Sequence, residues 1–382
     1  MNAGLLRRVA LSLAAPVSAL VIAVVASSIV LVIADSNPIQ AFSDMVAQAS
    51  RLETMVDILN RATPLYISGI AAAIGFRMNL FNIGVEGQYL LAALVAAQVG
   101  SLIDVWGPIH VSIILLTAMA VGAAYAGIAG FLKVTRGVNE VISTIMLNAI
   151  AISGLVAALV RAWQAGGGVD ATAGNQGIGT DLISDSGRIP SLNGFFELFT
   201  RDIGLGKEVT GVLAIAIVVG IGYHLLVNRS RFGFDLRASG FNPFAARAGG
   251  VEPRRMIFLA MVLSGAVAGL VGIAGISDVG RFNPNFVRGL GFAGIGVALL
   301  GRNHPGGVAI AALIFAFLDV SSGVLQISGN APREIVQILQ GVIILAAVVA
   351  YEVVERYRSR AEAKDAAAAL QAQADDPEAA IA

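Results

Sequence analysis

The sequence predicts an all-α, polytopic integral membrane protein with about ten transmembrane helices, of which one or two are short or broken. Three observations carry this prediction. Hydrophobic residues make up 57% of the 382 positions and charged residues only 13%, which is the composition of a membrane protein. The apolar residues gather in runs close to the roughly 20 residues that a helix needs to cross the hydrocarbon core. Lys and Arg cluster in alternate connections between these runs, as they do in cytoplasmic loops.

Ten apolar runs follow one another along the chain. Two of them are weak: the run at 63–80 contains Arg77, and the run at 290–301 is too short to cross the membrane straight. The predicted segments lie near 9–34, 63–80, 85–103, 110–132, 139–160, 210–228, 255–275, 290–301, 305–325 and 334–351.

The first run, 9–34, is free of charge and follows Arg7 and Arg8. A cleavable signal peptide and a first spanning helix share this pattern of a basic start and an apolar stretch. The apolar core of a signal peptide is only about 7 to 15 residues long, and no clear small-residue cleavage site ends this run. We therefore expect a first spanning helix whose N-terminus lies in the cytoplasm.

The charge pattern predicts the topology. With the N-terminus inside, most of the 25 Lys and Arg residues fall on inner segments, and both termini are then cytoplasmic. The predicted membrane domain is 1–351, and an Ala-rich polar tail, 352–382, follows it as a largely disordered cytoplasmic segment. One long outer loop, about 161–209, is rich in Gly, Ser and Asp, and is either a flexible connection or a docking surface.

Residue counts exclude several kinds of function. Lys plus Arg equals Asp plus Glu at 25 each, so no excess charge favours nucleic acid as a partner. Cysteine is absent, and His110, His224 and His304 are far apart in sequence, which argues against a metal site. The sequence has no GxxxxGK motif followed by Ser or Thr, so this chain hydrolyses no ATP through such a loop. No catalytic set of residues is evident, and we expect that the chain is not an enzyme.

Small residues recur at helix-packing spacing in two of the predicted segments. Gly122, Ala126 and Gly130 are four residues apart, as are Gly265 and Gly269. Small residues let membrane helices approach closely where no hydrophobic force drives them together. Glycine hinges are the alternative, but close helix packing is the favoured interpretation.

The longest inner loop, about 228–255, is rich in Arg. Within it, Asn242 can cap a short helix that has Pro243 at its first position. Gly249 and Gly250 would end that helix. An ordinary basic loop would also obey the orientation rule, but a capped helix of small residues is what a docking element for a partner needs.

Several polar residues lie inside or beside the predicted spans. A carboxylate at mid-bilayer costs about 2.5 to 3.5 kcal/mol on insertion scales, so such residues usually face a cavity or a partner. They either contact a ligand along a path or form hydrogen bonds between helices. The candidates are Asn82, Glu86 and Gln88 in one segment, Asn139, Glu140 and Asn148 in a second, and Asp319 in a third.

Glu86 has a specific structural interpretation. Asn82 and Gly84 interrupt the preceding run, and Arg77 holds its end near the cytoplasmic side, so a new helix is predicted to start at about Gly84. Glu86 then lies in the first turn of that helix, where a carboxylate meets unpaired backbone N–H groups and the positive end of the helix dipole. A capping role is favoured over direct ligand contact.

Five stretches of the sequence resemble one family. They are "FNIGVEGQ", "NEVISTIMLN", "LRASGFNPFAARAGGV", "LSGAVAGLVG" and "GFAGIGVALLGRNHPGG". In this order they resemble the membrane permeases of bacterial ABC importers, which carry sugars, branched-chain amino acids or nucleosides. The similarity covers roughly 60–350, and "NEVISTIMLN" most resembles the nucleoside permeases.

The resemblance implies a transmembrane permease subunit of an ATP-driven importer in the bacterial plasma membrane, with a path for nucleosides. It also implies three partners in the bilayer or beside it: a cytoplasmic ABC ATPase, which would use ATP and Mg, a second permease, and an extracytoplasmic substrate-binding lipoprotein. No cofactor is expected on this chain. Permeases for simple sugars or branched-chain amino acids, and an ion-coupled secondary transporter, are the alternatives. The positions that match the family's ATPase-contacting loop are Arg237, Ala238, Gly240, Asn242, Ala245, Ala246 and Gly249.

Overall fold

The structure is a computed structural model that describes residues 21–33 except 23, 36–164, 179–196, 207–321 except 284, and isolated positions beyond 321. Contacts divide the chain into two units, Met45–Ser322 and the pair Met1–Asp44 with Gly323–Ala382. The start of the first predicted span, most of the segment 334–351 and the tail 352–382 lie outside the described residues, as does much of the predicted outer loop.

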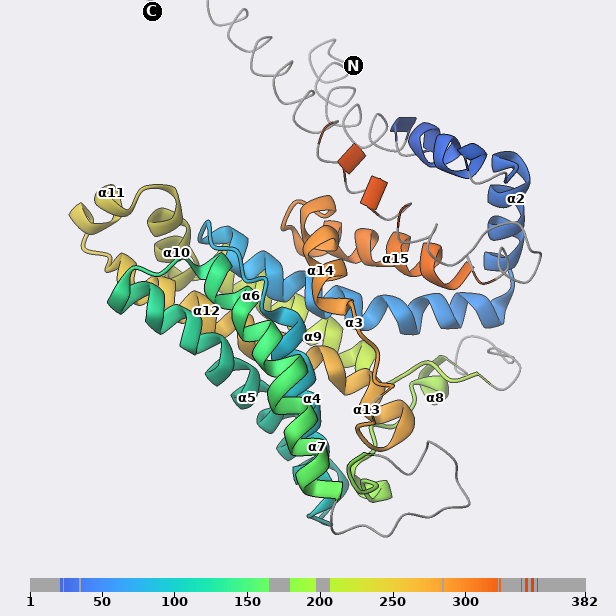
Figure 1. Ribbon diagram of the computed structural model, residues 1–382, viewed down its shortest axis with the longest axis horizontal. Helices are drawn as coiled ribbons and strands as arrows, with labels where there is room; N and C mark the ends of the chain where they lie inside the picture. Colours follow the sequence, from blue (N-terminus) through green and yellow to red (C-terminus); the bar gives the residue numbers. More distant parts are fainter. Residues whose placement is uncertain are drawn as a thin grey trace, which may run out of the picture. The chain divides into compact units, whose positions relative to one another are not determined.

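Every regular element among the described residues is a helix, which confirms the all-α class (Figure 1). The elements are α2 Pro38–Ala49, α3 Leu52–Arg77, α4 Val85–Ser101, α5 Gly107–Arg136, α6 Glu140–Ala149, the π-helix Ile150–Leu155, α7 Val156–Gln164, a 3-10 turn at Asp185–Gly187, α8 Asn193–Phe196, α9 Val212–Tyr223, the π-helix His224–Arg229, α10 Arg231–Phe241, α11 Pro243–Ala248, α12 Pro253–Gly269, a 3-10 turn at Leu270–Gly272, α13 Ile273–Val279, α14 Leu290–Leu300 and α15 Pro305–Ser321.

Several of these helices can cross a membrane. Within the described part of the chain, four continuous helical stretches are long and apolar enough, and a bent pair, Val24–Ile33 with Pro38–Ala49, is a fifth candidate. The helices α14 and α15 are apolar but shorter. A multi-span membrane protein is thus confirmed, whereas the count of ten stays a prediction. The four long stretches are Gly107–Arg136, Glu140–Trp163, Val212–Arg229 and Pro253–Val279.

The start of α3 differs from the prediction. The helix begins at Leu52, well before the predicted boundary at residue 63, and it continues through Pro64. Its first half carries charged residues, which is why the apolar pattern placed the start too late. Two of these charges are paired in the structure: Arg61 Nε lies 2.5 Å from Asp319 Oδ2 on α15, and Asp57 forms an ion pair with Lys207.

The helices α5 and α12 pack along each other through their small residues (Figure 1). A Cβ atom added at Gly122 would lie under 3.0 Å from the Gly265 carbonyl oxygen and the Gly269 nitrogen. A Cβ at Gly265 would likewise overlap Ala126. The two backbones are therefore in direct contact, and the predicted close-packing role of these small residues is confirmed.

The helix α14 is only half a span and packs on α3. The helices α9, α12, α14 and α15 all contact α3, which is the centre of the larger unit (Figure 1). The hydroxyl of Ser68 on α3 donates to the Leu290 carbonyl at 2.8 Å. Arg302 and Asn303, with φ of 56° and 55°, form the tight turn from α14 into α15. With 11 residues, α14 is about 16 Å long, so the prediction that this segment cannot cross straight is confirmed.

Candidate functional site

Four of the predicted polar residues gather where α4 begins, together with Ser264, which was not predicted. We call this group, Asn82, Glu86, Gln88, Asn148 and Ser264, the polar junction. All five side chains are buried. They come from the start of α4, from α6 and from α12. Three of the five sequence stretches that carry the family resemblance therefore meet at one point of the fold.

Glu86 links α4 to α14. Its side chain is only 3% exposed. One carboxylate oxygen accepts the Gly289 N–H at 2.6 Å, and the other accepts the Gly291 N–H at 2.8 Å. The Tyr89 hydroxyl lies 3.0 Å from Glu86 Oε1. Both N–H groups belong to the N-terminus of α14, where an anion is stabilised by unpaired donors and the helix dipole.

This arrangement confirms one half of the expectation for Glu86 and corrects the other. The residue lies in the first turn of α4, which starts at Val85, as predicted. Its carboxylate, however, caps α14 and not α4. At the N-terminus of α4, the hydrogen bonds come from Asn148. Its Oδ1 accepts the Gly87 N–H at 2.8 Å, and its Nδ2 donates to the Ile83 carbonyl at 2.7 Å.

Glycines let α6 approach the start of α4 closely enough for these hydrogen bonds. A Cβ at Gly87 would lie 2.9 Å from both Asn148 Oδ1 and the Ala151 Cβ. A Cβ at Gly84 would lie 3.2 Å from the Cβ of Thr144. Thr144, Asn148 and Ala151 are spaced by four and three residues, so they form one face of the helix turned toward α4.

The remaining members of the junction satisfy one another. Asn82 and Gln88 exchange two amide hydrogen bonds of 2.9 Å each. Asn82 also donates to the Ser264 hydroxyl at 2.9 Å, and that hydroxyl donates to the Ala71 carbonyl at 2.7 Å. A buried polar network whose members are all paired rigidifies the core that it joins. This geometry favours hydrogen bonding between helices over ligand contact for these side chains.

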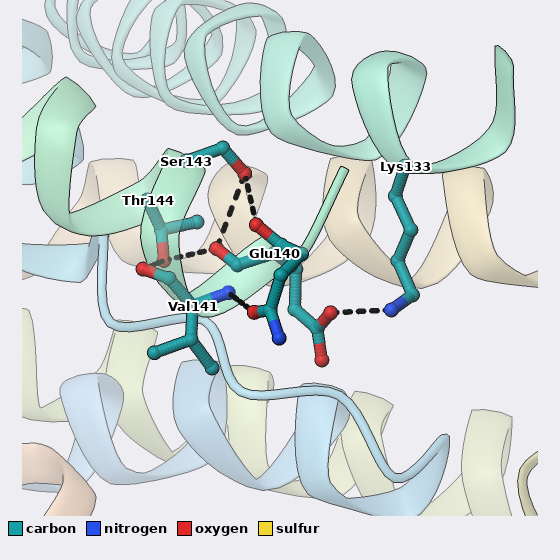
Figure 2. A network of polar contacts seen from close by, with 6 residues as sticks. Lys133, Glu140, Val141, Ser143 and Thr144 are labelled. Atoms are coloured by element: carbon teal, nitrogen blue, oxygen red, sulfur yellow. Dashed lines mark hydrogen bonds and ion pairs between the residues drawn. The ribbon is translucent and has the colours of Figure 1, made fainter. Parts of the chain in front are cut away.

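Asn139 and Glu140 lie apart from the junction, at the turn between α5 and α6 (Figure 2). The prediction that Asn139 lies within the span was wrong: it is the exposed N-cap, and its Oδ1 accepts the Val141 N–H at 2.8 Å. Lys133, near the end of α5, forms an ion pair with the buried carboxylate of Glu140. Ser143 and Thr144 donate to the Glu140 carbonyl. This group fixes the turn between α5 and α6.

Replacing Lys133 with Met is expected to lower the free energy of unfolding by about 1 to 2 kcal/mol, because the Glu140 carboxylate would stay buried without its cation. Thermal unfolding of the purified protein measures this loss. The double variant K133M/E140Q serves as the control and should recover most of it, since no buried charge is left. Equal unfolding temperatures for K133M and the unmodified protein would show that the ion pair contributes nothing.

The Arg-rich loop, 228–255, contains the predicted capped helix. Asn242 accepts the N–H groups of Phe244 and Ala245 at 3.0 and 3.1 Å, and Pro243 is the first residue of α11. The chain turns away at Gly250, which has φ of 82°. The short helix and its cap are thus confirmed. A second helix in the loop, α10, was not predicted, although Ser230 caps it by accepting the Gly233 N–H at 3.1 Å.

The base of the Arg-rich loop is fixed to the bundle. A Cβ at Gly240 would lie 2.8 Å from Met78 backbone atoms at the end of α3. Leu236 is buried in a cluster with Met78 and Met261 of α12. Arg237 donates to the Val227 carbonyl at the end of the preceding helix. Among the residues matched to the family's loop, Arg237 and Gly240 therefore anchor the base.

The tip of the Arg-rich loop exposes apolar side chains. Phe241 is 94% exposed and Phe244 is 86% exposed, on either side of the cap residue Asn242. Ala245 is exposed as well, whereas Ala246 is buried. Two exposed phenylalanine side chains on a basic loop are typical of a surface that contacts another protein. Sequence reasoning missed both, although a Phe on each side of an Asn-Pro pair was a signal in the sequence.

The described part of the predicted outer loop packs beside the start of α5. Ser184 and Ser186 donate to the Asp104 carboxylate at 3.0 and 2.7 Å, and Ser186 also contacts His110 Nδ1 at 2.8 Å. The hydroxyls of Ser186 and Ser184 hold the pKa of Asp104 below its usual value. Because the pKa of Asp104 is lower in the folded than in the unfolded chain, its ionised carboxylate stabilises the fold at pH values above the unfolded-state pKa. This contribution is lost as the pH falls through the folded-state pKa.

Helices that can span a membrane, joined by a buried polar junction, are what a multi-span membrane protein needs. Residues 54–348 match the family model described as the permease component of branched-chain amino acid transport systems. The chain belongs to this family, and it is a permease subunit of a transporter.

Three relatives align over most of the chain. The glucose ABC transporter permease of Haloferax volcanii is 31% identical over 345 residues, which cover 90% of this chain and 88% of the relative. The guanosine ABC transporter permease NupP of Bacillus subtilis is 33% identical, over 78% of this chain and 81% of the relative. The nucleoside ABC transporter permease NupB of Lactococcus lactis is 29% identical, over 86% and 88%. No solved structure matches this chain.

Proposed function

We propose that this chain is the permease subunit of an ATP-driven importer that carries nucleosides across a bacterial plasma membrane. In this proposal about ten helices cross the bilayer, and both termini and the Arg-rich loop are cytoplasmic. A cytoplasmic ATPase, a second permease subunit and an extracytoplasmic substrate-binding lipoprotein complete the complex. The concentration of Lys and Arg on alternate segments supports this orientation.

The geometry of the Arg-rich loop is the observation that carries the proposal. Its tip exposes Phe241 and Phe244, and its base is held against α3 and α12 through Gly240 and Leu236. An ATPase that binds the tip can therefore displace the ends of the two central helices. If the base of the loop were mobile, the tip could move by the same distance without displacing the helices of the bundle.

The choice of substrate rests on the relatives. Two of them are named for guanosine or nucleosides and align over more than three quarters of this chain. A sugar is the second candidate, because the glucose permease aligns over 90% of this chain at a similar identity. Nucleosides are preferred, since the stretch "NEVISTIMLN" also resembles the nucleoside permeases.

A substrate panel tests the proposed function. The chain is expressed with the reading frames that neighbour its own, and the purified complex is placed in vesicles with its binding protein outside and ATP inside. Uptake of labelled guanosine, adenosine, glucose and leucine is then compared. We expect the nucleosides to accumulate, with glucose and leucine at background. Accumulation of glucose or leucine in place of nucleosides would contradict the proposal.

Replacing Phe241 and Phe244 together with Ala is expected to lower substrate-stimulated ATP hydrolysis by about tenfold or more, because exposed aromatic anchors dominate the energy of such contacts. Both side chains are exposed, so the fold should stay intact. Phe195→Ala is the matched control, since Phe195 is an exposed phenylalanine on α8, in the predicted outer loop. Unchanged stimulation in the double variant would exclude the tip as the ATPase contact.

A charged residue tests the same contact in a second way. Ala245 is exposed on α11, so Ala245→Glu should keep the helix and place a carboxylate in the contact. Ala246 is buried, and a charge there would unfold the helix itself. We expect Ala245→Glu to reduce uptake while the subunit still assembles. Co-purification with the ATPase at low and high salt measures the assembly.

A further inference from the structure

The chain between α13 and α14 is not helical at the described residues 280–283 and 285–289; we call these residues the extended segment. It follows a long helical span, Pro253–Val279, and leads into the half-length helix α14. The far end of α14 adjoins Asn303, whose carbonyl accepts from Arg77 at 2.9 Å at the end of the bundle that carries the Arg-rich loop. Because α14 is about 16 Å long and the hydrocarbon core about 30 Å thick, the extended segment ends near mid-membrane.

One side of the extended segment is buried against the bundle. The rings of Phe282 and Phe286 stack with centroids 4.7 Å apart, and both side chains are buried. Phe286 lies over Gly272, in the turn from α12 to α13, and over Gly275 of α13, where an added Cβ would be 2.8 Å from the Phe286 Cζ. The segment is thus held in place, although it has no helical hydrogen bonds of its own.

The start of α4 holds the inner end of the extended segment. The Tyr89 hydroxyl donates to the Val287 carbonyl at 2.7 Å, and Glu86 accepts the Gly289 N–H at 2.6 Å. Tyr89 is fully buried. Glu86 belongs to the polar junction, so the junction helps to fix the position of the segment in addition to joining helices.

The other side of the extended segment is open. Asn285, Val287, Arg288 and Gly289 are exposed. Irregular backbone at membrane depth occurs only where protein or water covers it, because lipid cannot satisfy its polar groups. A guanidinium such as that of Arg288 is also costly in lipid and usually faces a bundle interior or a water-filled cavity. The open side therefore faces an aqueous space or a partner subunit, not the lipid.

We propose that the open side of the extended segment lines the substrate path, with Asn285 and Arg288 offering amide and guanidinium donors to the passing molecule. This inference rests on the proposed function. The hydroxyl groups and base edge of a nucleoside are matching acceptors, and Asn and Arg side chains read purine edges in the same way in nucleic-acid complexes. Breaks in membrane helices mark binding sites in many transporters.

Single cysteines test this proposal with no background from this chain, because its sequence has no cysteine. Asn285→Cys, Val287→Cys and Arg288→Cys are introduced one at a time into the full complex, at exposed positions where the fold should tolerate them. A membrane-impermeant methanethiosulfonate reagent is added from the outer side, with and without ATP. We expect labelling in at least one of these states, a loss of uptake of about tenfold after labelling, and protection by guanosine with the binding protein.

Two control positions calibrate the labelling. Val218→Cys places a thiol on α9, at an exposed site of an apolar helix that faces lipid, and should stay unlabelled. Leu182→Cys, exposed in the outer connection, should be labelled without any effect on uptake. If Leu182→Cys is labelled but the three segment positions stay unlabelled in every state, the proposal is wrong. Labelling of the segment without any loss of uptake would overturn it as well.

The failure of this proposal is distinguishable from failure of the proposed function. Labelling reports water access whatever the substrate is. If the substrate panel identified a sugar and labelling still blocked its uptake, the path would stand and the nucleoside assignment would fall. If nucleoside uptake survived complete labelling at each of the three positions, the nucleoside assignment would stand and the proposed path would fall.

Discussion

Replacing Glu86 with Gln is expected to destabilise the protein by about 2 kcal/mol, because the two N–H groups at the start of α14 would lose a charged acceptor. Glu86 is the buried partner of Gly289 and Gly291, and it accepts from both with different oxygens. Gln has the same shape but only one acceptor oxygen. The amide nitrogen of Gln is itself a donor, so it would face one of the two backbone N–H groups without forming a hydrogen bond. One N–H in the interior would then have no partner.

Thermal unfolding of the purified complex, read with the uptake per assembled complex, measures this effect. We expect a lower unfolding temperature with most of the uptake per assembled complex retained, since one oxygen can still hold the extended segment. Glu208→Gln is the control, because Glu208 is exposed and its substitution should change the stability little. Normal stability with abolished uptake would mean that Glu86 contacts the substrate directly.

Replacing Gly122 with Ala is expected to cost about 3 kcal/mol, or to prevent assembly, because one methyl group would separate α5 from α12. The added Cβ would lie under 3.0 Å from backbone atoms of Gly265 and Gly269. Backbone atoms cannot rotate away as a flexible side chain can. The helices would have to move apart along their whole contact, and this would displace Ser264 of the polar junction.

Gly222→Ala is a matched control for this prediction. It makes the same change in a membrane helix, α9, where nothing lies within 4 Å of the added Cβ. Alanine is the better helix former by up to about 1 kcal/mol, so the control should be neutral or stabilising. The yield of folded protein and its unfolding temperature compare the two variants. If both variants behaved alike, close contact between α5 and α12 would not contribute to stability.

The features that the sequence could predict are those set by neighbouring residues. The cap at Asn242, the proline after it and the glycines at the end of α11 lie within a few positions of one another, and the structure confirms them. Small residues four apart on α5 and α12 identified the contact between these helices for the same reason. The start of α4 after Gly84 was likewise a local signal.

The features that sequence reasoning missed depend on partners far along the chain. Glu86 was recognised as a capping carboxylate, but the donors that it caps lie 203 and 205 residues away. The early start of α3 depends on ion pairs such as that between Arg61 and Asp319, which are 258 residues apart. A single sequence does not reveal which distant group neutralises a charge, so charged helical turns were read as loop.

The energy source of uptake tests the central claim most directly. Vesicles that contain the complex and its binding protein are loaded with ATP, with a non-hydrolysable analogue, or with no nucleotide under an imposed sodium or proton gradient. The account predicts that labelled nucleoside accumulates only with hydrolysable ATP inside, and that the Phe241 and Phe244 double variant loses this accumulation. Accumulation driven by an ion gradient without ATP would contradict it.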